Sequence, residues 1–245
     1  MTRVTLVGAK GRMGVAIQRV ANALPQVSLA WLVDAGDPFE QPVAECDVVI
    51  EFSHHTVTPS IAKLCADLKR PLVIGTTGHT DEERHTVAEA ANKVPVVFAP
   101  NFSVGVNTLF ALVAQAVRIL GEDFDLEVVE MHHRHKQDAP SGTAKRLVEI
   151  LAQARNLSYD EHVRHGREGL LGARTQKEIG VHARRGGDVV GDHTVIFAAD
   201  GERLEVTHKA SSRETFARGA LRAALWVTAR DPGLYDMQDV LGLGR

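Results

Sequence analysis

Short apolar runs alternate with longer helical patterns through residues 1–100, and this alternation constrains the fold more than any other feature of the chain. Strands are predicted at Val4–Val7, Ser28–Val33, Val48–Glu51, Leu72–Gly75 and Val96–Ala99. Helices are predicted between them, near Met13–Leu24, Val57–Leu68 and Glu82–Asn92. Such alternation is typical of a parallel sheet wrapped by helices through right-handed crossovers. It predicts a doubly wound sheet whose ligand crevice lies at the carboxyl ends of the strands.

The pattern changes after Asn107, which places a domain boundary near residue 105. Helices are predicted at Thr108–Leu120, Ser141–Arg155 and Glu214–Ala229, and strands at Asp125–Met131, Val189–Ala199 and Arg203–Lys209. The region Ser158–Gly187 is predicted to form long connections around one short strand. We therefore predict an α/β protein with two domains. Residues 1–105 form an N-terminal Rossmann-like doubly wound parallel sheet, and residues 106–213 form a second α+β domain built on a mixed, largely antiparallel sheet.

The composition is that of an ordinary globular protein, with 44% hydrophobic and 24% charged residues in a chain of 245. A formal net charge of -3 gives no argument for a nucleic-acid or membrane partner, since both usually require a basic excess. No apolar stretch approaches the roughly 18 residues of a membrane span. The two cysteines, Cys46 and Cys65, and the lack of a secretory segment before the first strand predict a reduced, cytoplasmic protein.

A glycine-rich turn follows the first strand directly and has the sequence Gly8-Ala9-Lys10-Gly11-Arg12-Met13-Gly14. Small residues let the backbone approach a pyrophosphate, and the helix that begins near Arg12 directs free N–H groups at it. Asp34 closes the second strand about 20 residues later, where a carboxylate commonly binds the ribose hydroxyls. The sequence therefore predicts a nicotinamide dinucleotide here. The alternative is that the glycines only form a tight connection and that Asp34 caps a loop.

Asp34 also bears on the choice between NADH and NADPH, because a carboxylate repels a 2′-phosphate unless a cation offsets it. The residues that follow, Ala35-Gly36-Asp37, supply no cation. We expect NADH to be at least as good as NADPH, although Lys10 or Arg12 could still reach the phosphate.

Two further turns fall at strand ends, Gly75-Thr76-Thr77-Gly78 and Ala99-Pro100-Asn101-Phe102. Both are expected at the edge of the sheet where the nicotinamide half of the cofactor would lie. Each could equally be a plain connection.

The most unusual stretch is His-rich and places three His, one Arg and one Lys within His132–Lys136, ahead of a helix start at Ser141-Gly142-Thr143. A cationic cluster is costly to assemble without an anion, and N–H groups at a helix start can bind a carboxylate. One end of an anionic substrate is the predicted occupant. Hydride transfer to an unsaturated carbon or imine leaves a negative charge that needs a proton, and a His or Lys is the usual donor.

Two alternatives remain open for this stretch. A zinc site could use His132, His133 and His135, but neighbouring histidines in an extended chain point to opposite faces and no Cys lies nearby. The other alternative is a solvated polar loop.

Several motifs together resemble the dihydrodipicolinate reductase family over nearly the whole chain. They are the glycine turn, VIGTTG (73–78), APNFSVGVN (99–107), EMHHRHKQDAPSGTA (130–144), SSRETFARGALRAALW (211–226) and LYDMQDVLGL (234–243). The resemblance implies NAD(P)H-dependent reduction of dehydrated 4-hydroxy-tetrahydrodipicolinate, a cyclic dicarboxylate, to tetrahydrodipicolinate in diaminopimelate and lysine biosynthesis. It also implies that residues 214–245 complete the first domain and that the subunits form a homotetramer through the sheet of the second domain.

The resemblance also assigns roles to individual residues. His132 is implied as the proton donor with Lys136 as its catalytic partner, and the substrate carboxylates are held by His133, Ser141, Gly142 and Thr143. The cofactor is assigned to Gly8, Ala9, Lys10, Gly11, Arg12, Met13, Asp34, Gly75, Thr76, Thr77, Ala99, Pro100, Asn101 and Phe102, with no metal. Many relatives carry a basic residue where this chain has Ala35. The lack of that basic residue weakens any preference for NADPH.

Two other functions compete with the reductase. The first is a dehydratase that binds the same cyclic dicarboxylate without redox turnover, against which the intact glycine turn argues. The second is a non-catalytic nucleotide sensor, against which the pair of His132 and Lys136 argues.

Overall fold

The computed structural model describes residues 1–243 and consists of two compact units. The first is formed by Met1–Val104 and the segment from Arg213 onward, and the second by Gly105–Ser212. The last two residues of the expected segment 214–245 lie outside the described residues. Each unit has its own core and is described separately.

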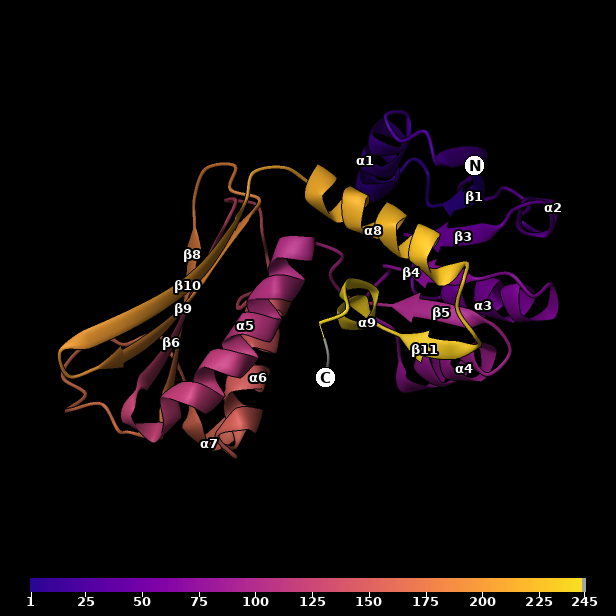
Figure 1. Ribbon diagram of the computed structural model, residues 1–245. Helices are drawn as coiled ribbons and strands as arrows, with labels where there is room; N and C mark the ends of the chain where they lie inside the picture. The colour runs from indigo at the N-terminus through magenta and orange to yellow at the C-terminus, as the bar shows by residue number, and fades with distance from the viewer. Residues whose placement is uncertain (244–245) are drawn as a thin grey trace. The chain divides into compact units, whose positions relative to one another are not determined.

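The first unit is built on a six-stranded parallel sheet in the order β11-β5-β4-β3-β1-β2 (Figure 1). Its strands are β1 (Thr2–Val7), β2 (Val27–Val33), β3 (Val48–Glu51), β4 (Leu72–Ile74), β5 (Pro95–Phe98) and β11 (Gly233–Tyr235). Its helices are α1 (Arg12–Ala21), α2 (Glu40–Ala44), α3 (Thr58–Asp67), α4 (Asp81–Ala91), α8 (Glu214–Val227) and α9 (Met237–Leu241). The predicted Rossmann-like doubly wound sheet is confirmed, while α2, β11 and α9 were missed because each is five residues or shorter.

Side chains alternate between the two faces of this sheet, as the twofold period of a strand requires. On β3, Val48 and Ile50 pack with α1, α8 and α9, whereas Val49 packs with α2, α3 and α4. Both faces are therefore covered by helices, which explains the nearly continuous apolar runs of the central strands. The carboxyl ends of the strands remain as the edge at which a ligand can approach.

The second unit holds a five-stranded mixed sheet in the order β10-β9-β6-β8-β7. Its strands are β6 (Asp125–His132), β7 (Val163–His165), β8 (Ile179–Arg185), β9 (Gly191–Ala199) and β10 (Glu202–Ala210). Its helices are α5 (Val104–Leu120), α6 (Gly142–Ala154) and α7 (Tyr159–His162), with a 3-10 turn at Gly121–Asp123. Figure 1 shows α5 and α6 on one side of the sheet.

The predicted mixed, largely antiparallel sheet is confirmed, because β9 pairs antiparallel with β10 and β6 over more residues than β8 pairs parallel with β6 and β7. One detail of this unit corrects the sequence analysis. The region 158–187 contains α7, β7 and β8 rather than one short strand. Hydrophobic periodicity identifies a strand but carries no information about its direction, and β7 is only three residues long.

The segment Val104–Asp123 corrects another expectation, because among the described residues it is a helix long and apolar enough to cross a membrane. Length and composition alone give this result. One face of α5 is buried in the core of the second unit, through Val106, Leu109, Phe110, Val113 and Val117. We therefore interpret α5 as an amphipathic core helix.

Gly219 sets how closely α8 packs in the first unit. A Cβ built at Gly219 would lie 1.7 Å from the carbonyl oxygen of Phe102, in the segment that follows β5. We expect Gly219→Ala to lower the free energy of unfolding by about 1–3 kcal/mol, because backbone must shift to admit the methyl group. Thermal unfolding measures this loss.

Gly142→Ala is the matched control, since a Cβ there would have no neighbour within 4 Å. It should unfold within a degree or two of the unmodified protein, or above it. Equal midpoints for the two variants would contradict the close packing at Gly219.

Candidate functional site

The glycine turn joins β1 to α1 and is held mainly by backbone contacts. Gly8 has a φ of +83°, and a Cβ there would lie 2.1 Å from the carbonyl oxygen of Phe52. A Cβ at Gly14 would lie 2.2 Å from the carbonyl oxygen of Gly8. Glycine at these two positions is therefore explained by packing of the protein itself, and the cofactor assignment needs further evidence.

The start of α1 provides such evidence. Its N-cap is Gly11, which has no side chain to bond the first N–H groups of the helix. These groups and the positive end of the helix dipole are available to an anion. The arrangement fits a pyrophosphate.

Asp34 lies beside this turn at the end of β2. Its Oδ2 accepts a hydrogen bond of 2.6 Å from the N–H of Lys10, and its Oδ1 accepts one from Ala35. These backbone hydrogen bonds lower the pKa of Asp34, and the nearby Lys10 ammonium adds to the effect. The carboxylate is thus ionised, and it ties the turn to β2. An ionised carboxylate is the form that would accept hydrogen bonds from ribose hydroxyls.

A cavity of about 750 Å³ opens between the glycine turn and Asp34, and it is lined by residues of the first unit alone. Gly8, Gly11 and Asp34 line it, together with the rings of Phe39 and Phe52 and with His54. An apolar wall for a base beside an acidic group for a ribose fits one end of a dinucleotide. Asp37 and Glu40 also line this cavity, so its rim is acidic.

The turns after β4 and β5 do not line this cavity, but a buried carboxylate links one of them to it. Glu51, at the end of β3, has no exposed surface and accepts hydrogen bonds from Ser53, Thr58 and Thr76. Ser53 lines the cavity, so Glu51 fixes the Gly75-Thr76-Thr77 turn relative to it. The Phe102 side chain is buried and packs edge-on against Phe52 at 5.5 Å, so it is not open to a ligand.

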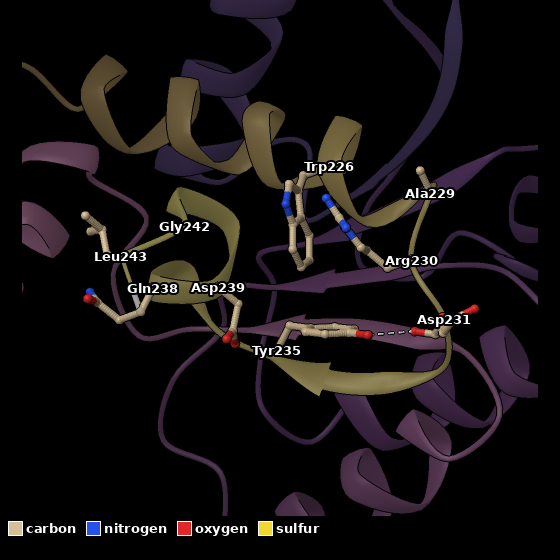
Figure 2. A pocket seen from close by; sticks show the side chains of 9 residues that line it. All are labelled: Trp226, Ala229, Arg230, Asp231, Tyr235, Gln238, Asp239, Gly242 and Leu243. Carbon is tan, nitrogen blue, oxygen red and sulfur yellow. Dashed lines mark hydrogen bonds between the residues drawn. The ribbon is translucent and has the colours of Figure 1, made fainter. Parts of the chain in front are cut away.

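A second hollow in the first unit, of about 420 Å³, contains none of the predicted site residues (Figure 2). The Arg230 guanidinium lies over the Trp226 ring at 4.3 Å, and Tyr235 packs edge-on against the same ring. The Tyr235 hydroxyl donates a hydrogen bond to the carbonyl of Asp231. These contacts secure β11 and the end of α8.

In the second unit the predicted site is organised around Glu130, which has no exposed surface. Its Oε2 accepts hydrogen bonds from His132 Nδ1 at 2.5 Å and from Arg185 Nη1 at 2.9 Å. Its Oε1 accepts from Arg185 Nη2 at 3.0 Å and from the N–H of Ser141 at 3.2 Å. One carboxylate therefore connects the predicted proton donor with the predicted carboxylate-binding helix start.

Strand geometry explains why these residues meet. Glu130 and His132 are two residues apart on β6 and so point to the same face of the sheet. In the sheet register, His132 lies opposite Arg185 on β8, and Glu130 lies opposite His193 on β9.

Ser141 is the N-cap of α6, and its Oγ accepts a hydrogen bond from the N–H of Ala144. The same Oγ lies 3.0 Å from Nε2 of the buried His193. Gly142 and Thr143 form the first turn of α6, a helix of 13 residues. The positive end of the helix dipole therefore lies at the segment predicted to bind an anion.

The remaining residues of the His-rich stretch are less buried. Lys136 lies on the loop after β6 and pairs with Asp138 at 2.7 Å, with 19% of its side chain exposed. Arg134, His135 and Gln137 are exposed, so the solvated-loop alternative holds for these three positions. Within residues 1–243, no three His, Cys, Asp or Glu side chains converge in a way that could hold a metal ion.

Three residues of this site were missed by the sequence analysis: Glu130, Arg185 and His193. The period of two along β6 could have identified Glu130, because it must share a face with His132. Arg185 and His193 are distant in sequence and enter through the pairing of β8 and β9, which no local pattern reveals.

The pKa values of Glu130 and His193, which both lie beside His132, are shifted. Burial alone would raise the pKa of Glu130, but hydrogen bonds from His132 and Arg185 outweigh it and lower the pKa to about 2. Burial lowers the pKa of His193 from 6.5 to about 3, and the nearby His132 adds to the effect. The folded protein thus holds Glu130 charged and His193 neutral.

The His193 shift predicts an acid sensitivity of the fold. The unfolded chain binds a proton at His193 below pH 6.5, whereas the folded protein does so only near pH 3, so stability falls as the pH drops through this interval. Each pKa unit corresponds to about 1.4 kcal/mol. Denaturant unfolding of His193→Asn between pH 7 and 4 should therefore show a shallower loss of stability than the unmodified protein shows.

His85→Asn serves as its control, because the His85 side chain is 76% exposed on α4. It should keep the pH dependence of the unmodified protein. Parallel curves for all three proteins would disprove the assigned titration of His193.

Two family models cover almost the whole chain. The model described as dihydrodipicolinate reductase, N-terminus, matches residues 2–102, and the one described as dihydrodipicolinate reductase, C-terminus, matches residues 105–241. A protein of Akkermansia muciniphila named 4-hydroxy-tetrahydrodipicolinate reductase is 56% identical over 245 residues, the full length of both chains. A protein of the same name from Anaeromyxobacter dehalogenans is 48% identical over 99% of this chain and 98% of its own.

A solved structure agrees in fold. The dipicolinate-bound dihydrodipicolinate reductase of Paenisporosarcina sp. TG-14 superposes with a TM-score of 0.80 at 23% identity, covering 98% of each chain. The similar proteins are named as reductases, so the dehydratase alternative finds no support. The chain belongs to the dihydrodipicolinate reductase family.

Proposed function

We propose a division of labour in which the first unit binds NADH or NADPH and the second binds and protonates the substrate. As a member of its family, the chain is an NAD(P)H-dependent oxidoreductase of diaminopimelate and lysine biosynthesis, and its substrate is a cyclic dicarboxylate. It reduces 4-hydroxy-tetrahydrodipicolinate, after loss of water, to tetrahydrodipicolinate. The residues that perform these steps are our proposal.

The observation that carries the proposal is the contact set of Glu130. It brings a buried imidazole, with its Nδ1 bonded to a carboxylate, beside the start of a helix that can bind an anion. An acid that delivers a proton needs both a fixed orientation and a substrate fixed next to it. His132 and the Ser141-Gly142-Thr143 cradle meet this requirement within a single unit.

In the first unit, the uncapped start of α1 and the glycine turn hold the pyrophosphate, and Asp34 binds the ribose hydroxyls. The residues we assign to the cofactor are those from Gly8 to Met13, Asp34, Gly75 to Thr77 and Ala99 to Phe102. The bound cofactor supplies the hydride. This chain's own contribution is to orient the nicotinamide half through the backbone of the turns after β4 and β5.

In the second unit, His132 donates a proton from Nε2 to the atom that becomes electron-rich when hydride arrives. Lys136 is its partner, a cation close to that developing charge, and it exchanges its contact with Asp138 for one with the substrate. His133 and the start of α6 bind the substrate carboxylates. Charge-assisted hydrogen bonds to an anion are short and strong, which makes these contacts effective.

Two further proposals concern the whole molecule. We assign it to the cytoplasm, in keeping with its two free, buried cysteines. We also propose a homotetramer formed through the second unit, whose sheet carries half-buried apolar side chains such as Val129, Met131 and Ile196 on the face opposite the core.

Replacement of the two neighbouring histidines separates proton donation from binding. General acid catalysis contributes about 10²–10⁴-fold, so His132→Gln should lower kcat within that range and leave the KM for NADH unchanged. His133→Gln should instead raise the KM for the substrate more than it lowers kcat, because it removes a binding contact. The assay follows NADH absorbance with enzymatically generated dihydrodipicolinate.

Reversed phenotypes would exchange the two roles. Unchanged kinetics in both variants would remove the His-rich stretch from the mechanism.

The acidic rim of the first-unit cavity predicts the coenzyme preference. Asp34, Asp37 and Glu40 line it, and each disfavours a 2′-phosphate. The KM for NADH should be no higher than that for NADPH, and Ala35→Arg should improve NADPH selectively. Steady-state kinetics with both coenzymes decide this, and a hundredfold preference of the unmodified enzyme for NADPH would refute it.

A further inference from the structure

The carboxylate of Glu130 contacts His132, the proposed proton donor. It is fully buried, it makes four hydrogen bonds, and only one of its neighbours, Arg185, carries a permanent charge. A buried carboxylate is costly unless it is satisfied in this way. The four hydrogen bonds therefore hold an ionised carboxylate in a fixed place beside His132.

We infer that Glu130 is a positioning residue that fixes His132 in the tautomer with a proton on Nδ1, leaving Nε2 as the atom that delivers the proton to the substrate. This inference rests on the proposed role of His132.

The protonation states determine the direction of the hydrogen bond. Glu130 is ionised, since its pKa is lowered to about 2, and an ionised carboxylate only accepts hydrogen bonds. At 2.5 Å, the His132 Nδ1 must therefore carry the proton. The other nitrogen, Nε2, is free of this contact and can exchange a proton with a ligand.

The surroundings of Nε2 support the assignment. A Cβ built at Gly191 would lie 3.0 Å from Nε2, so glycine at the start of β9 avoids a side chain against this edge of the ring. The His193 ring meets the His132 ring edge-on at 5.1 Å, and His193 is held neutral by burial. A neutral neighbour does not repel the protonated form of His132.

Glu130 is also the anion that offsets the cations of this site. The charged and titratable groups that face it or the adjoining rings are Arg185 on β8, His193 and Asp192 on β9, His208 on β10, and Lys136 and Asp138 on the loop after β6. Without the Glu130 charge, protonated His132 would lie near Arg185 and Lys136 and would lose the anion bonded to it. The same carboxylate bonds the N–H of Ser141, so it sets the distance between the proton donor and the cradle.

Glu130→Gln removes the charge and keeps an acceptor for Nδ1. We expect kcat to fall by about 10- to 100-fold, less than in His132→Gln. The pH at which kcat declines on the alkaline side should move down by about one unit or more, because the protonated imidazole loses its anionic partner. The KM for NADH should stay unchanged, and Glu130→Asp should recover part of kcat.

Glu127→Gln is the matched control. Glu127 lies on the same strand, three residues earlier, and bonds Arg167 and His182. It is a hydrogen-bonded carboxylate outside the contact set of Glu130, so its replacement should leave the pH profile in place. A downward shift of the same size on the alkaline side in both variants would show a general effect of charge and would overturn the positioning role.

A measurement on the unmodified enzyme removes the dependence on folding of the variants. In ¹⁵N spectra of histidine-labelled protein, the His132 resonance, assigned by its loss in His132→Gln, should report a protonated Nδ1 at every pH between 5 and 9. A neutral ring protonated on Nε2 would refute the inference. If His132→Gln lowers kcat but Glu130→Gln keeps the kcat of the unmodified enzyme, the inference is refuted and the proposed function stays intact. If His132→Gln leaves kcat unchanged, the proposed function itself is refuted.

Discussion

Glu130 accepts four hydrogen bonds from three different elements although it has no contact with solvent. Its carboxylate joins β6 to β8 through Arg185, orients His132 on its own strand, and receives the first N–H of the α6 cap at Ser141. Removal of any one partner would leave a buried charge or donor unsatisfied, which is costly in a low dielectric. The geometry of the proposed substrate site in the second unit depends on this carboxylate, because the groups bonded to it come from separate segments of the chain.

The first unit also contains a fully buried carboxylate, but with different hydrogen-bond donors. Glu51 is buried as completely as Glu130, but the described bonds to its side chain come from hydroxyl and backbone donors of Ser53, Thr58 and Thr76 rather than from a guanidinium. A carboxylate satisfied by hydroxyl groups ties two strand ends together without placing a cation there. In the cofactor site that we propose, the nicotinamide half would lie near these strand ends, where an added fixed charge would alter the field at the reacting carbon.

Prediction from the sequence succeeded where the signal is local. The alternation along β1 to β5 gave the parallel sheet, and the stretch from His132 to Thr143 gave the proton donor candidate and the α6 cap. It failed where strand pairing decides the outcome. The parallel direction of β8 brings Arg185 beside His132, and the antiparallel β9 brings His193 beside Glu130, and neither follows from composition or periodicity. Glycine identity was also less informative than it looked, because packing against backbone already requires Gly8 and Gly14.

His132 and His193, whose rings are in contact, have opposite environments in this protein. His132 donates to an ionised carboxylate, whereas His193 is buried against Ser141 and remains neutral down to about pH 3. If Nε2 of neutral His193 carries its proton, the Ser141 oxygen accepts from both His193 and Ala144, and the Ser141 proton is left for a substrate carboxylate. In the mechanism that we propose, burial and the position of a single carboxylate thus assign proton donation to His132 and leave His193 neutral beside Ser141. Surface charge would not achieve this, because solvent would screen the difference between the two rings.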